Sequence, residues 1–378
     1  MRRGPLIGGC LVGIAISWNI ANVGPVATLL AHTYGIGLAT IGLLTTVLFF
    51  GELPVMLPGG RAIDRHGAKR MGLLAVAVSL VANLLLMLST APAVALSLRG
   101  LAGLGVGLGF LAGAIYAQSG AGPAVALAGG IYGGVSLGSG GLALAIVPQL
   151  VPALSWRAPY ASGAGVAALC MPLIALCPVA PGHRGHAAGP SFAALLSDRR
   201  LIRLGIILSV SFGFSVILGN WVVTLLERTE GMSRATAGAI GSLIFLLGIV
   251  GRPAGGMLVR AIPRHIRKML AASFAAGALG TTLVVLSPGR AGDAVATGLI
   301  GIAAGIPFGA AVAGATRTHP EAAGAAVGAV NVYAITVIVC GAPLVGATLA
   351  LPGNGRIGFG GLAALWLAAT VVLRRLDT

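Results

Sequence analysis

Long apolar runs follow one another along almost the whole chain, and short polar turns separate them. Each run is about as long as the ~20 residues that an α-helix needs to cross a bilayer. The runs predict about twelve membrane-spanning helices, at residues 5–31, 37–60, 71–90, 93–116, 122–148, 158–180, 203–227, 235–259, 268–287, 293–315, 321–350 and 356–374. We therefore predict an all-α membrane protein.

One polar stretch, residues 181–202, is much longer than the other turns and contains His183, Arg184, His186, Asp198, Arg199 and Arg200. It predicts a cytoplasmic linker between an N-terminal half at 1–180 and a C-terminal half at 203–378. A weak internal repeat supports this division, because residues 56–64 align with residues 252–260 around a shared Gly-Gly pair. The expected fold is two parallel repeats of about six helices each.

The composition restricts the class of protein. Apolar residues make up 57% of the sequence and charged residues 8%, with a mean hydropathy of +0.99, so lipid must solvate most of the surface. A net charge of +16 can indicate nucleic-acid binding, but no soluble basic domain and no interleaving of aromatic and basic residues accompanies it. The glycines of residues 103–109 follow no strand and precede no Lys-Ser/Thr pair, which argues against a phosphate loop.

No set of side chains indicates catalysis. No nucleophile–base arrangement can be proposed. The four cysteines lie in or beside apolar runs without metal-ligand spacing, at Cys10, Cys170, Cys177 and Cys340. We therefore expect no enzymatic activity, no catalytic residue, no metal and no cofactor.

The basic residues are distributed unevenly between the two sides of the predicted bundle. The side that holds both termini carries most of them, whereas the opposite loops carry only Arg157, Arg228, Arg234, Arg290 and Arg356. Because Lys and Arg are enriched in cytoplasmic loops, we predict that both termini are cytoplasmic. The expected location is the bacterial inner membrane, with multiple crossings. Two basic residues, Arg99 and Arg252, fall inside predicted helices.

The densest cluster of charge lies between the second and third predicted helices. It reads Gly60-x-x-x-Asp64-Arg65-x-Gly67-x-Lys69-Arg70. This spacing resembles the loop between helices 2 and 3 of the major facilitator superfamily, where the usual pattern is Gly-x-Leu-Ala-Asp-Arg-x-Gly-Arg-Lys. Ala62 and Ala68 stand where the family has leucine and one basic residue.

The resemblance implies a secondary active transporter that works by alternating access to a central site. It also implies that this segment is a gate, in which Asp64 caps or pairs with neighbouring helix ends and holds one conformation closed. The alternative is a solvated loop whose charges only set the topology. The predicted gating motif consists of Gly60, Asp64, Arg65, Gly67, Lys69 and Arg70.

Glu52 and Arg99 are the candidates for proton coupling. Glu52 lies ~12 Å from Gly60 along the second helix, where an ionised carboxylate is costly and a group that takes up and releases a proton is suited. The alternative is a structural ion pair. Arg99 begins an Arg-x-x-x-Gly-x-Gly sequence, which resembles the helix 4 motif of many proton-driven members of the superfamily. It could pair with Glu52 or extend to the outer interface.

Arg252 indicates the class of substrate. It lies ~12 Å from Arg260 along the eighth helix, near mid-membrane, where an unpaired arginine is costly. A guanidinium in a polar cavity binds planar oxyanions through its fork of donors. The Arg-Pro-x-Gly-Gly sequence resembles the nitrate/nitrite porter branch, in which each half supplies an arginine, whereas the first-half counterpart here is Met56.

Uncharged polar residues inside the helices complete the substrate-binding candidates. The full set is Arg252, Asn19, Asn22, Asn220, Asn331 and Tyr333. The family geometry favours Asn19, Asn22 and Asn220 as cavity-lining residues. Each could instead join helices through hydrogen bonds.

Two classes of transport remain open. Proton-coupled movement of a small anion or polar metabolite, such as nitrate, nitrite, cyanate or a carboxylate, is favoured by Arg252. Proton-driven export of drugs or hydrophobic metabolites is favoured by the helix 4 motif. A membrane scaffold or sensor of the same fold is the non-transporting alternative. The expected partners are a small-molecule or anionic substrate, protons and lipid, without nucleic acid, and we expect a monomer.

Overall fold

The computed structural model describes residues 2–179, 191–261, 263–319 and 323–374, and every regular element in these ranges is helical. Eleven stretches are long and apolar enough to cross a membrane. One of them, Leu127–Leu176, contains two helices joined by a short turn, so the described residues make twelve crossings. This confirms the prediction of an all-α membrane protein.

Residues 2–179 form the N-terminal helices. They are α1 (Arg3–Ala21), α2 (Ala27–Tyr34), α3 (Leu38–His66), α4 (Ala68–Leu86), α5 (Pro92–Gln118), α6 (Val125–Leu154) and α7 (Ala158–Leu176). Most ends lie within a few residues of the predicted ones. The predicted linker is described only from residue 191, and its last residues are helical, because α9 begins at Arg199.

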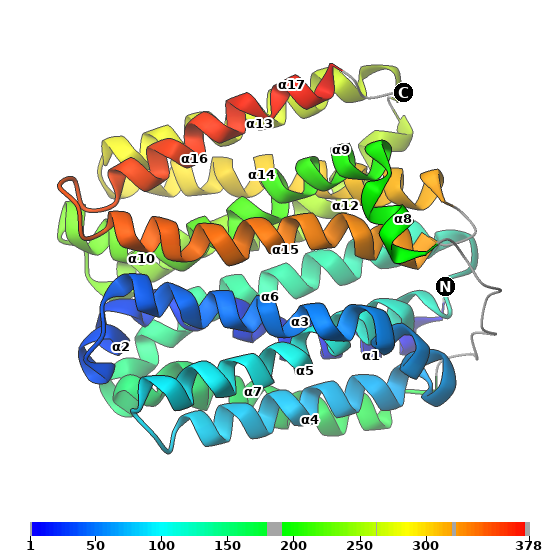
Figure 1. Ribbon diagram of the computed structural model, residues 1–378, viewed down its shortest axis with the longest axis horizontal. Coiled ribbons are helices and arrows are strands. Elements are labelled where there is room, and N and C mark those ends of the chain that lie inside the picture. The colour runs from blue at the N-terminus through cyan, green and yellow to red at the C-terminus, as the bar shows by residue number, and fades with distance from the viewer. Residues whose placement is uncertain (1, 180–190, 262, 320–322, 375–378) are drawn as a thin grey trace.

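The C-terminal helices follow a short helix in the linker, α8 (Phe192–Ser197). They are α9 (Arg199–Leu208), α10 (Phe214–Glu230), α11 (Arg234–Leu246), α12 (Gly248–Ala261), α13 (Ile266–Leu286), α14 (Arg290–Thr318), α15 (Ala323–Thr348), α16 (Arg356–Ala368) and α17 (Thr370–Leu373). The two termini of the described chain lie at the same end of the bundle (Figure 1). We call this the terminal end and the opposite end the distal end.

The turn between α3 and α4 is shorter than the sequence suggested. We predicted that the second helix ends near Gly60, but α3 continues to His66 and α4 begins at Ala68. Only Gly67 separates them, with a φ of +85° that favours glycine. Most of the predicted gating motif is therefore helical.

Three crossings contain a break in the regular helix. A 3-10 turn at Gly24–Val26, with proline at its second position, separates α1 from α2. A π-helical turn at Ser209–Gly213 joins α9 to α10, and α11 ends at Leu246 before α12 begins. Proline cannot donate the backbone hydrogen bond of a continuing helix, and π-helical turns occur frequently at functional sites.

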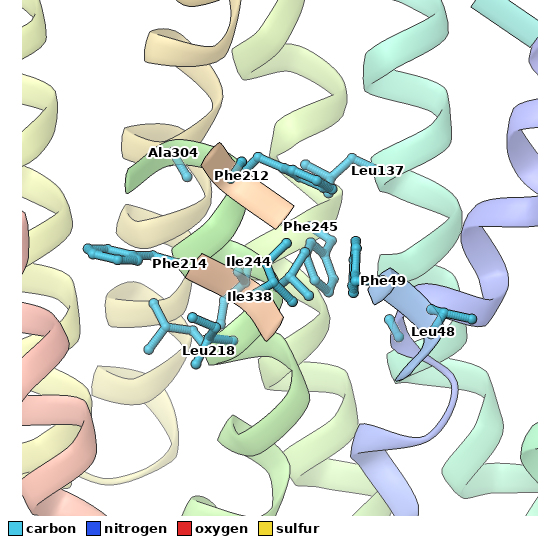
Figure 2. Packing of buried hydrophobic residues seen from close by; sticks show 14 of the residues in the cluster. Leu48, Phe49, Leu137, Phe212, Phe214, Leu218, Ile244, Phe245, Ala304 and Ile338 are labelled. Carbon is cyan, nitrogen blue, oxygen red and sulfur yellow. The ribbon is translucent and has the colours of Figure 1, made fainter. Parts of the chain in front are cut away.

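The N-terminal and C-terminal helices meet along two seams. In one seam α3 packs against α15, and in the other α6 packs against α11 and α12. Buried apolar side chains fill the space between the seams. Figure 2 shows Phe49 beside Phe245, with Phe212 and Leu137 next to each other nearby. The Phe49 and Phe212 rings meet edge to face, with centroids 6.2 Å apart.

Candidate functional site

A small cavity lies where the two groups of helices meet. Its lining residues are Ser17, Ile20, Glu52, Val106, Phe110, Ser136, Leu137, Gly140, Phe212, Phe245, Arg252 and Asn331. The cavity volume is about 20 Å³, close to the minimum that holds one water molecule. The described conformation is therefore nearly closed around its centre, and it brings together three predicted site residues, Glu52, Arg252 and Asn331.

Glu52 reaches this cavity from the middle of α3. Its side chain is only 4% exposed, and Oε1 has no hydrogen-bond partner. The close packing of α5 places it there, since a Cβ atom on Gly107 would lie 2.9 Å from the Glu52 Cα. A buried carboxyl oxygen without a donor is costly when the group is ionised. Glu52 is thus suited to carry a proton.

Arg252 reaches the cavity from α12 on the opposite side. Its Nη1 donates to the Gly133 carbonyl of α6 at 3.0 Å. Its guanidinium carbon lies 3.7 Å from the ring centroid of Phe308 and 5.5 Å from that of Phe212. Nε is buried and has no acceptor. The two rings and the carbonyl hold the guanidinium in place, while Nε keeps one unused donor.

Glu52 and Arg252 do not pair with each other. Within the described chain no salt bridge to either residue is present, whereas Arg234 pairs with Glu227 and His319 pairs with Asp198. The cavity therefore contains one carboxyl group and one guanidinium, each with an atom that lacks a protein partner. This arrangement can bind an anion and a proton within one cavity.

Arg99 lies elsewhere, and the anticipated pair with Glu52 is not formed in the described structure. Arg99 is fully buried and donates to the carbonyl groups of Leu44 and Asn19, at 3.2 and 2.8 Å, and to Asn22 Oδ1 at 3.3 Å. Leu44 precedes Glu52 by eight residues of helix, or ~12 Å. Arg99 thus lies nearer the distal end and binds helix backbone. It also does not extend to the outer interface.

The predicted asparagines occupy different environments. Asn331 lines the cavity. Asn19 donates to Ser79 Oγ at 2.7 Å and accepts from Asn83 Nδ2 at 2.7 Å, which joins α1 to α4. Asn22 donates to the Pro159 carbonyl of the α7 segment at 2.8 Å. Asn19 and Asn22 thus join helices in this conformation and are not among the cavity-lining residues.

Asn220 and Tyr333 are also absent from the cavity lining. Asn220 accepts a hydrogen bond from Thr45 Oγ1 at 2.8 Å, between α10 and α3, and its Nδ2 has no partner. The Tyr333 hydroxyl donates to the Leu196 carbonyl of α8. Asn220 therefore lies at the seam between the helix groups, and Tyr333 binds the linker helix.

Sequence reasoning missed several lining residues. Ser136 lies in a glycine-rich run of α6, where a single serine gives no signal of its own. Phe110, Phe212 and Phe245 had no polar signal, and their apolar side chains look like ordinary core or lipid-facing residues in the sequence. Only the π-helical turn that contains Phe212 distinguishes its position, and the sequence does not reveal that turn.

The distal ends of the two helix groups are joined by a polar cluster. Arg234 Nε pairs with Glu227 Oε1 at 3.0 Å, and Arg234 Nη2 donates to Thr28 Oγ1 at 3.3 Å. Thr28 Oγ1 also lies 3.4 Å from Glu227 Oε2. Because Thr28 belongs to α2 and the other two to α10 and α11, the cluster connects the N-terminal helices to the C-terminal ones. We call these three residues the distal lock.

The predicted gating motif lies at the terminal end. Lys69 Nζ donates to the carbonyl groups of Ala175 and Cys177 at 2.8 and 2.6 Å, which satisfies carbonyls at the end of α7. Arg65 and Arg70 are exposed. The side chain of Asp64 lies outside the described part of the structure, so its gating role stays a prediction.

A model of the Major Facilitator Superfamily matches residues 9–341. The chain belongs to this superfamily. Among solved structures, the crystal structure of the nucleoside transporter NupG (D323A mutant) matches with a TM-score of 0.74, covering 99% of this chain and 100% of that chain. The sequences are 12% identical, so this likeness shows the fold alone. No curated protein matches the chain in sequence.

Membership of the Major Facilitator Superfamily defines the general activity. The protein is a secondary transporter with multiple membrane crossings, and the family is not enzymatic. A superfamily transporter implies a small-molecule substrate and a membrane. The family match covers the helices that carry Glu52 and Arg252.

Proposed function

We propose that this transporter moves a small anionic solute together with protons, with Arg252 as the anion contact and Glu52 as the proton carrier. The proposal rests on one observation. The two side chains line one cavity from opposite groups of helices, while Glu52 Oε1 and Arg252 Nε have no protein partner. A ligand that binds there would contact both groups and would link their movements.

The geometry of Arg252 supports an anion as the substrate. Phe308 lies against one face of the guanidinium, and Gly133 occupies Nη1. This leaves Nε as a donor for a planar oxyanion such as nitrate, nitrite or a carboxylate. In the nitrate/nitrite porter branch each half supplies an arginine, whereas here Met56 stands at the first-half position. One arginine suits a singly charged anion.

The position of Glu52 supports coupling to protons. A neutral Glu52 leaves Arg252 free to balance the charge of the anion, whereas an ionised Glu52 in the same cavity would compete for Arg252. Loading of the anion is therefore linked to protonation of Glu52. Release of the proton then weakens anion binding, because the two negative charges repel each other.

Proton-driven export of drugs or hydrophobic metabolites is the second candidate. Phe110, Phe212 and Phe245 contribute rings to the cavity lining, and aromatic side chains favour apolar ligands. In that case Arg252 is a structural charge that Gly133 and Phe308 stabilise.

We further propose that the terminal end is cytoplasmic, as the positive-inside distribution indicates, in a bacterial inner membrane. The halves at 1–180 and 203–378, connected by the linker at 181–202, then rock about the central cavity in a monomer. The distal lock would close the outer face in this arrangement.

Thermal stabilisation of the purified protein tests the proposed function. The ligand panel contains nitrate, nitrite, cyanate, small carboxylates, sugars and lipophilic cations, and it is applied to the wild type and to Arg252→Ala. A ligand that binds the folded state raises its melting temperature by mass action. We expect a shift with an anion that the variant loses.

Arg252→Lys is the matched control, because it keeps the charge and removes the fork of donors. We expect it to bind the anion more weakly than the wild type and more strongly than Arg252→Ala. Stabilisation only by lipophilic compounds, unchanged in Arg252→Ala, would refute anion transport and support export.

A further inference from the structure

A second acidic site lies at the distal end of the C-terminal helices, away from the central cavity. Glu230 is the last residue of α10, and Asp293 lies in the first turn of α14. The Asp293 side chain is completely buried, and its carboxyl group lies within reach of the Glu230 carboxyl group. Glu230 Oε1 also accepts the backbone N–H of Gly289 at 3.0 Å. Two carboxyl groups thus meet where α10, α14 and the turn before α14 come together.

No N–H or hydroxyl donor of the described chain satisfies Asp293. Both of its carboxyl oxygens are buried without such a partner. If both acids were ionised, two negative charges would lie side by side, with one of them removed from water. A single proton between the carboxyl groups removes the repulsion and supplies the missing donor.

The basic groups nearby are engaged elsewhere or exposed. The charged side chains on the surrounding elements are Glu227, Arg228, Arg234, Arg290 and Arg356. Arg234 pairs with Glu227, and Arg228 and Arg356 each donate to a backbone carbonyl. Arg290 is exposed. Within the described chain, none of them forms an ion pair with the two acids.

We propose that Glu230 and Asp293 form a proton-binding site in which the two carboxyl groups share one proton. This site is separate from Glu52 and goes beyond the proposed coupling scheme. A metal ion fits less well, because a hard cation takes about six or more oxygen ligands, and no group of three or more acidic, histidine or cysteine side chains exists in the described residues. The shared proton holds the start of α14 against the end of α10.

Loss of this proton has a defined structural consequence. The two carboxylates repel each other, and the first turn of α14 separates from the end of α10. Glu227 of the distal lock is on α10, within one turn of Glu230. Deprotonation at the distal surface therefore loosens the C-terminal side of the distal lock. The site makes closure of that end sensitive to the pH on its own side of the membrane.

The test compares the wild type with Asp293→Asn in lipid nanodiscs, by melting temperature across buffers from acidic to alkaline pH. A proton that binds the folded protein more tightly than the unfolded chain stabilises it by mass action. We expect the wild type to lose stability as the proton is released, and Asp293→Asn to lack this part of the loss, because the amide donates permanently to Glu230. Thr229→Ala, on the same helix and bonded only within it, is the matched control and should keep the pH-dependent loss.

Infrared difference spectra provide a second measurement that does not depend on stability. The band of a protonated carboxyl group should decrease in Asp293→Asn and in Glu230→Gln relative to the wild type. An unchanged band in both variants would refute the proposal, and so would the same pH dependence of melting in Asp293→Asn. A rise in the wild-type melting temperature with sodium at constant ionic strength, absent in the variant, would also overturn it in favour of a cation site.

Discussion

Glu52 and Arg252 line one cavity from α3 and α12, and no salt bridge joins them. Opposite charges in a membrane protein attract strongly, so two ionised groups that line the same small cavity would be expected to pair. Their separation is consistent with a neutral Glu52 in this conformation and leaves Nε of Arg252 available. The cavity is nearly closed, which means that substrate enters only after the two helix groups move apart.

Glu52→Gln should abolish the response of transport to a pH gradient and leave substrate exchange intact. The amide keeps the shape and polarity of the side chain but cannot carry a proton. Uptake into proteoliposomes, with and without an imposed pH gradient, measures the first property, and counterflow measures the second. Glu52→Asp keeps the carboxyl group and should retain a gradient response. Equal gradient dependence in the wild type and Glu52→Gln would remove Glu52 from the coupling scheme.

Arg99→Ala should destabilise the protein strongly. Arg99 is fully buried and satisfies two backbone carbonyls and Asn22 Oδ1. Each buried acceptor left without a donor costs about 1–3 kcal/mol, so the loss is expected to be on the order of 3 kcal/mol or more. Melting in detergent checks this. Arg157→Ala is the control, because Arg157 is exposed and donates to one carbonyl. A similar small shift in both variants would contradict the structural role.

The sequence was sufficient to predict the helices, but it did not predict the contacts between distant segments. Apolar length identifies a crossing, and a buried charge such as Arg252 stands out against it. Which face of a helix such a charge occupies depends on the rotation of that helix against its neighbours. Eight residues of α3 separate Leu44, which Arg99 contacts, from Glu52, and only the packing of α3 against α5 determines this level. The same holds for Asn19, whose partners in α4 are far away in sequence.

Asp293 illustrates a second limit. The predicted helix at residues 293–315 begins at Asp293, so this acid was expected at a helix end near water, where a carboxylate is common. The structure begins α14 at Arg290 instead, so Asp293 falls inside the first turn and is buried beside Glu230. A difference of three residues at one helix boundary changes a solvated acid into a buried one. Boundaries are the least certain part of any prediction from sequence.

Glu227→Gln should shift the conformational equilibrium toward opening of the distal end. The substitution removes the ion pair with Arg234 and weakens the connection to Thr28. Spin labels on Thr90 and Pro288, two exposed distal positions, report the separation of the helix groups in a cysteine-free background. We expect a larger population of long distances. Thr229→Ala is the control, since Thr229 bonds only within its own helix. Identical distance distributions would show that the lock does not hold this end.

Asp64→Asn should reduce transport and leave substrate binding largely intact. Asp64 lies in the last two turns of α3, beside the one-residue turn at Gly67, where a carboxylate can hold neighbouring helix ends together. Transport into proteoliposomes and ligand-induced melting shifts separate the two properties. Arg70→Gln, at an exposed position after the turn, should have a smaller effect. Equal loss of binding and transport in Asp64→Asn would contradict a gate.

Asp198→Asn should lower the melting temperature slightly at neutral pH and have no effect in strong acid. Burial raises the pKa of Asp198, but hydrogen bonds from His319 and from the amides of Arg200 and Leu201 outweigh it and lower the pKa below its usual range. A lowered pKa in the folded state stabilises the protein above the unfolded value of about 3.9 and loses that effect as the pH falls further. Because Asp198 is partly exposed, water screens the interaction and the difference is small. Asparagine still caps α9, so a gap between variant and wild type that persists below pH of about 3 would contradict a charge effect.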